Sequence, residues 1–125
     1  MIRILVESDK GRIELEAELF EKSAADRIKE ELPITSTLRT WGDEIYFDTG
    51  IDEVPADDAT LEVDPGDVAF WPEGKSLCVF FGPTPASRGD RPVPASEVVL
   101  VGKTRNDPSV LRLARSGAKV TVEQG

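Results

Sequence analysis

Histidine is absent from this chain, and cysteine occurs only once, as Cys78. Without histidine the chain has no Ser-His-Asp or Cys-His nucleophile system and no imidazole ligand for a metal. A single cysteine excludes a disulfide within the chain and any zinc or iron–sulfur site that needs several thiolates. Any chemistry must therefore come from carboxyl, guanidinium, amine, phenol and backbone groups, and we expect neither a metal nor another cofactor.

Long apolar runs and an excess of basic residues are also missing. No stretch approaches the roughly 18 apolar residues of a membrane-spanning helix, and the first ten residues alternate like a strand and unlike a signal peptide. Acidic residues number 24 against 15 basic ones, and the net charge of −9 repels nucleic-acid phosphates. We expect a cytoplasmic protein with no membrane or nucleic-acid partner; the composition leaves the oligomeric state open.

Alternating apolar and polar residues dominate the 125 positions, which we interpret as one domain over 1–125. Residues 2–7 and 12–19 alternate on either side of a turn that contains Gly11, which predicts a β-hairpin. Similar patterns, separated by turn residues, predict about eight short strands in all, with helices at 21–32 and after Asp107. Further strands are expected at 35–39, 44–48, 60–63, 68–71, 76–81, 97–101 and 118–123. So many short strands with few free edges indicate a closed β-barrel.

Two segments stand out beyond this pattern. Residues 82–94 hold four prolines and two glycines with no apolar periodicity, and a loop of this length in a compact domain is often functional. The acidic stretch 52–58 lacks the ligand spacing of a calcium loop, so we interpret it as a solvated loop.

The segment 66–85, GDVAFWPEGKSLCVFFGPTP, resembles the signature of a small cyclophilin-like domain family of archaea and bacteria, whose cellular function is unknown. Residues 40–47, TWGDEIYF, resemble the second signature of that family, and residues 98–103, VVLVGK, are similar to the last third of a cyclophilin. The resemblance covers nearly the whole chain. It implies a mainly β fold, an eight-stranded closed antiparallel cyclophilin-like β-barrel with two capping helices.

The resemblance also implies a site. Cyclophilins turn X-Pro bonds with an arginine that donates to the prolyl nitrogen, and this chemistry needs no acid, base or metal because the barrier comes from amide resonance. Arg39, just before the turn at 41–43, is the candidate for that donor. The implied groove is bordered by Arg39 and by ligand-binding side chains on the neighbouring strands and loop, namely Trp41, Tyr46, Phe47, Trp71, Phe81 and Thr84.

Three functions follow from this resemblance. The first is a module that binds a peptide or a proline-containing protein segment with little or no isomerase activity, because Trp71 and Pro72 stand where cyclophilins carry an alanine–asparagine pair. The second is an active peptidyl-prolyl cis-trans isomerase that uses Arg39. The third is a small anionic-molecule binder in the same pocket, where Arg39 would hold a carboxylate. Whether the groove is open depends on the direction of Trp71.

Overall fold

The computed structural model describes all residues from 1 to 125. Its nine strands are β1 (Ile2–Ser8), β2 (Gly11–Leu19), β3 (Ile34–Thr37), β4 (Arg39–Thr40), β5 (Glu44–Asp48), β6 (Asp67–Trp71), β7 (Ser76–Phe80), β8 (Val99–Thr104) and β9 (Lys119–Gln124). An α-helix, α1 (Ser23–Glu31), follows the first hairpin, and a 3-10 helix, η1 (Pro108–Leu113), precedes the last strand.

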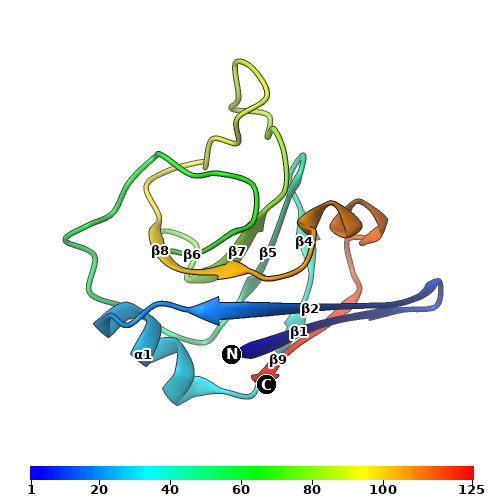
Figure 1. Ribbon diagram of the computed structural model, residues 1–125, viewed down its shortest axis with the longest axis horizontal. Coiled ribbons are helices and arrows are strands. Elements are labelled where there is room, and N and C mark those ends of the chain that lie inside the picture. The colour runs from blue at the N-terminus through cyan, green and yellow to red at the C-terminus, as the bar shows by residue number, and fades with distance from the viewer.

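One antiparallel sheet contains every strand, in the order β3-β9-β1-β2-β8-β6-β7-β5-β4. Its two edge strands, β3 and β4, are consecutive in the chain and are separated only by Leu38. The Leu38 amide donates to the Ala118 carbonyl, and the Leu38 carbonyl accepts from the Gly117 amide. Because one short segment forms both edges, the sheet curls into a nearly closed barrel (Figure 1). The predicted fold class is confirmed, and β3 and β4 counted as one interrupted strand give the expected eight.

The local predictions succeed where the sequence pattern is regular. β1 and β2 form the predicted hairpin, with Ser8 opposite Gly11. In α1 the side chains of Ala24, Ala25 and Ile28 are buried. Asp107 begins η1 by accepting a hydrogen bond from the Ser109 amide, but the helix has 3-10 and not α geometry. Figure 1 shows α1 and η1 on different sides of the barrel. Neither helix is long and apolar enough to cross a bilayer.

The strand predicted at 60–63 is wrong. Only Thr60 pairs there, through a single bridge to Val98, while Val63 is buried against the outer surface of the sheet. This segment therefore covers the barrel wall and does not extend it.

Strand alternation gives the sheet two buried faces. The inner face fills the barrel with a cluster of 26 buried residues, including Val68 and Phe70 of β6. Between these two, Ala69 points outward into a second cluster of five buried residues. The outer cluster consists of Val63, Ala69, Cys78, Phe80 and Val98, with Tyr46, Trp71 and Leu100 packed against it. The outer cluster forms the floor beneath the candidate site.

Candidate functional site

A pocket of about 170 Å³ opens on the outer face of the sheet. It is lined by seven residues, Trp41, Glu44, Tyr46, Trp71, Pro94, Ala95 and Val98. An apolar cavity of about 150 Å³ is enough to bind benzene. The pocket therefore has room for one side-chain-sized group.

The strand registers bring the pocket residues together. Arg39 lies opposite Tyr46, Tyr46 lies opposite Cys78, and Cys78 lies opposite Ala69. Residues directly opposite one another on antiparallel strands point to the same face, so these four form one row across the outside of the barrel. Glu44, two residues before Tyr46, lies on this same face, as does Trp71, two residues after Ala69.

Trp71 forms one wall of the pocket and leaves it open. Its ring meets the Tyr46 ring edge-on, with centroids 6.0 Å apart and an interplanar angle of 87°. Its indole Nε1 donates a hydrogen bond of 2.6 Å to the Ser96 hydroxyl. A Cβ at Gly74 would lie 2.2 Å from the Trp71 ring, so the ring packs directly on a glycine backbone. These three contacts fix the direction of the side chain.

The loop between β7 and β8 supplies three further lining residues, Pro94, Ala95 and Val98, and hydrogen bonds within this loop hold its shape. The Thr84 hydroxyl donates to the Val93 carbonyl and accepts from the Ala86 amide. The Ser87 hydroxyl donates to the Arg91 carbonyl at 2.7 Å. The backbone before Pro94, the first of these lining residues, is therefore held by hydrogen bonds within the loop.

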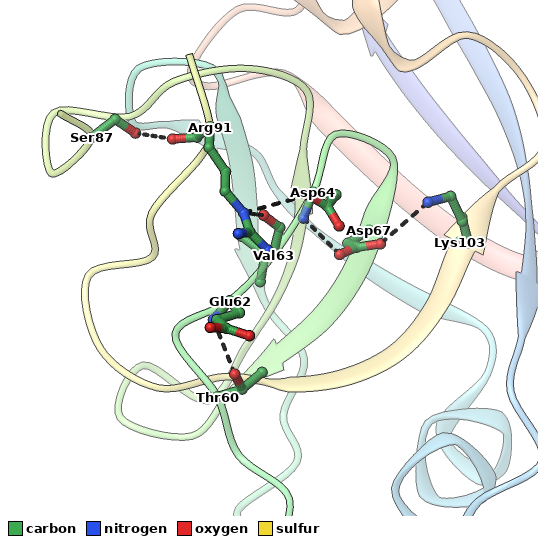
Figure 2. A network of polar contacts seen from close by, with 8 residues as sticks. All are labelled: Thr60, Glu62, Val63, Asp64, Asp67, Ser87, Arg91 and Lys103. Atoms are coloured by element: carbon green, nitrogen blue, oxygen red, sulfur yellow. Dashed lines mark hydrogen bonds and ion pairs between the residues drawn. The ribbon is translucent and has the colours of Figure 1, made fainter. Parts of the chain in front are cut away.

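A second set of polar contacts fastens this loop to the sheet, as Figure 2 shows. The Arg91 guanidinium donates to the Val63 carbonyl at 3.1 Å and lies 3.4 Å from the Asp64 carboxylate. Asp67, in turn, accepts from the Asp64 amide at 2.8 Å and pairs with Lys103 at 3.7 Å. The chain leading to β6 thus connects the loop to β6 and β8, and the pocket wall is preorganised.

Glu44 is the one charged residue in the pocket lining, and its side chain is almost fully buried, with 5% exposed. Burial raises the pKa of Glu44 from 4.5 to about 7, and a hydrogen bond with the Cys78 thiol opposes this rise only in part. Burial and the nearby Glu44 carboxylate raise the pKa of Cys78 well above its ordinary value. One Glu44 oxygen, Oε1, has no hydrogen-bond partner. The pocket therefore combines aromatic walls with an unsatisfied carboxyl group.

Three of the predicted ligand-binding residues, Trp41, Tyr46 and Trp71, line the pocket together. Arg39 is exposed beside Tyr46 and lies outside the lining.

The other predicted ligand-binding residues, Phe47, Phe81 and Thr84, do not border the pocket. Phe47 and Phe81 are buried in the inner core, Phe47 because it follows Tyr46 on the strand and so faces the opposite way. Thr84 is buried too, and its hydroxyl is used inside its own loop.

Sequence reasoning missed Glu44 and the wall residues Pro94, Ala95 and Val98. The available signal for Glu44 was its position two residues before Tyr46, which places both side chains on one face of a strand. The wall residues carry no comparable signal, because they depend on how the loop folds back. No group of three or more cysteine or acidic side chains is arranged to hold a metal ion.

Comparison with known proteins shows which family the chain belongs to. The family model described as cyclophilin-like matches residues 1–123. The chain is also similar to the solved solution structure of the hypothetical protein AF2241 from Archaeoglobus fulgidus, with 36% sequence identity and a TM-score of 0.76. That match covers 99% of this chain and 95% of the archaeal chain. No curated protein matches. The chain therefore belongs to the cyclophilin-like family, as its two signature segments indicated.

Proposed function

We propose that this protein binds a peptide segment across the outer face of its barrel and takes one side chain of that segment into the aromatic pocket. The observation that carries the proposal is a pocket of about 170 Å³ with three aromatic rings in its lining. Pockets for drug-sized ligands usually measure about 300–1,000 Å³, so this one suits a single side chain better than a whole metabolite. Aromatic anchors of this kind supply much of the affinity in peptide and protein recognition.

Prolyl isomerisation is the second candidate, and the position of Arg39 favours it. Arg39 is exposed and shares a row with Tyr46, so its guanidinium projects from the face that carries the pocket. A donor there would be available to the amide nitrogen of a proline seated in the pocket and would stabilise the twisted bond. The third candidate, a small anion, is not favoured, because the lining contains a carboxyl and no basic side chain.

The test is an NMR titration of labelled protein with short proline-containing peptides, with exchange spectra recorded on the cis and trans signals of the peptide. We expect shifts at the indole signals of Trp41 and Trp71, and Trp41→Ala should weaken binding by about tenfold or more. Leu113→Ala is the matched control, since Leu113 is 73% exposed and does not line the pocket. Absence of any shift with a varied peptide panel would contradict peptide binding.

Exchange spectra separate the two candidates. Uncatalysed exchange takes tens to hundreds of seconds, so cross-peaks within about a second report catalysis. If Arg39 acts on the twisted amide, Arg39→Ala abolishes the cross-peaks and leaves peptide affinity largely unchanged. Binding without cross-peaks in the unmodified protein identifies a binding module.

A further inference from the structure

One oxygen of the Glu44 carboxyl group has no hydrogen-bond partner in the chain. Only 5% of Glu44 is exposed, although the residue lines the pocket, and its Oε1 atom makes no hydrogen bond. Buried polar atoms in folded proteins are nearly always hydrogen-bonded, so an unsatisfied carboxylate oxygen requires an explanation. The terminal torsion of a glutamate is soft, which allows the carboxyl to turn toward a group that enters the pocket.

The walls around Glu44 have the chemistry of a cation site. The faces of tryptophan and tyrosine rings attract positive charge, most strongly where water is excluded. The pocket has three such rings, from Trp41, Tyr46 and Trp71, and its other lining residues are Pro94, Ala95 and Val98. No lysine or arginine lines the pocket, so the lining itself supplies no positive charge to balance Glu44.

We propose that the pocket selects an alkylammonium group, from a lysine side chain or a peptide N-terminus, with Glu44 as its counterion inside the aromatic walls. This inference rests on the proposed peptide-binding function and names the side chain that the pocket takes. The net charge of −9 attracts such a ligand to the protein.

Two other cations fit the site less well. A hard metal ion needs several oxygen ligands, whereas the pocket lining offers one carboxyl group. A guanidinium group binds best when it bridges both oxygens of a carboxylate, and here the carboxyl group already interacts with the Cys78 thiol. An ammonium group is a compact charge that one free oxygen can satisfy.

The charge of Glu44 makes binding depend on pH. Its pKa of about 7 means that the carboxylate needed for an ammonium ligand is lost as the pH falls below 7. The other titratable groups on this face are Tyr46 on the same strand, Cys78 on β7 and the exposed Arg39 on β4, which lies opposite Tyr46 outside the lining. Asp43, in the preceding turn, pairs with Arg112 at 3.4 Å, and Asp67 of β6 pairs with Lys103. The loop wall contributes no charged side chain to the lining.

The test compares four synthetic peptides of one sequence by calorimetry at pH 7.5, where most of a free N-terminus is still an ammonium group. One has an acetylated N-terminus and a central lysine, and the second carries norleucine in place of that lysine. The third carries acetyl-lysine, and the fourth carries norleucine with a free N-terminus. We expect a peptide with an ammonium group to bind about tenfold or more tightly than its uncharged counterpart, the size expected for a hydrogen bond between charged groups.

Glu44→Gln should reduce this preference to near unity, where the preference is the ratio of the affinities of the lysine and norleucine peptides for the same protein variant. Glu97→Gln is the matched control, because Glu97 is exposed on the loop between β7 and β8 and lies outside the lining. In buffers of different ionisation enthalpy, binding of the lysine peptide at pH 7 should release about half a proton, because Glu44 is then about half protonated and the ligand requires its ionised form. Glu44→Gln should abolish that release.

The outcomes separate the two proposals. Tight binding of either ammonium peptide supports the inference, and the lysine and N-terminal arms show which source the pocket prefers. Equal binding of lysine and norleucine peptides, with the free N-terminus adding nothing, overturns the inference and leaves peptide binding in place. Absence of binding by all four peptides, together with no shifts in the proline-peptide titration, overturns the proposed function itself.

Discussion

At the scale of single residues, Glu44 combines deep burial with an ionisable group that lacks a full set of partners. A neutral side chain of similar size would be less costly to bury at this position, because desolvation disfavours the charged form. The carboxyl therefore opposes folding above neutral pH, which makes a ligand role the more economical explanation of its position.

This cost predicts a particular pH dependence of stability. The pKa of Glu44 rises from 4.5 to about 7 on folding, so its protonated form is favoured in the native state. The stability that this group contributes is fully present below pH 4.5 and is lost as the pH rises to about 7. The free energy of unfolding should fall by about 3 kcal/mol over this range. We expect Glu44→Gln to remove this part of the pH dependence of the free energy of unfolding.

Urea unfolding at pH 4.5, 6 and 8 provides the measurement. As the pH rises, the Glu44→Gln variant should become more stable relative to the unmodified protein, as judged by the free energy of unfolding. Glu97→Gln should follow the unmodified protein. Parallel curves for Glu44→Gln and the unmodified protein would show that the carboxyl titrates normally.

At the scale of elements, the loop between β7 and β8 decides whether the pocket has its second wall. The Thr84 hydroxyl binds the Val93 carbonyl and the Ala86 amide, which joins the two ends of the loop tip. Gly42, at φ +61, brings the turn after β4 against this loop, since a Cβ there would lie 2.8 Å from Pro85. The turn that carries Trp41 and the loop that carries Pro94 thus support each other.

Thr84→Val should loosen the loop, because it leaves the Val93 carbonyl and the Ala86 amide without their partner. We expect a loss of roughly 1–3 kcal/mol in unfolding free energy, typical of unsatisfied buried polar groups. Amide exchange should become faster at 86–93, and peptide binding should weaken. Thr84→Ser keeps the hydroxyl and is the matched control. Unchanged exchange in Thr84→Val would mean that Ser87 and Arg91 hold the loop without it.

At the scale of the whole molecule, the barrel presents the pocket within a strongly acidic protein. With a net charge of −9, the protein attracts a cationic peptide before contact, and dissolved salt screens this attraction over about 10 Å at 0.1 M ionic strength. Association of the lysine peptide should therefore slow several-fold as salt is raised from about 0.02 to 0.5 M.

Stopped-flow measurement of tryptophan fluorescence would follow this association, because Trp41 and Trp71 line the pocket. The acetylated norleucine peptide should show little change in association rate over the same range of salt. A salt dependence shared by both peptides would contradict this prediction, because the acetylated norleucine peptide has no ammonium group for the protein to attract.

Much of the fold was predictable from local pattern. Strict alternation in β2 predicts one buried and one exposed face, and that periodicity holds wherever the strand pairs. The signature segments around Trp41 and Trp71 predicted the family, and both tryptophans line the pocket. Failure began where the pattern was short, as at 60–63, since a few apolar residues fit a strand or a segment that covers a strand equally well.

The sequence by itself determined the absence of imidazole chemistry, the acidic charge and the alternation that builds a barrel, because composition and periodicity are local properties. Only the tertiary structure decided which aromatic side chains share the pocket and that Glu44 is buried among them. Those outcomes depend on the registers between β4, β5 and β7 and on a loop that returns to bring Pro94 and Val98 into the same pocket as Trp41. Contacts between residues so distant in the chain are set by packing of the whole barrel, which no single segment encodes.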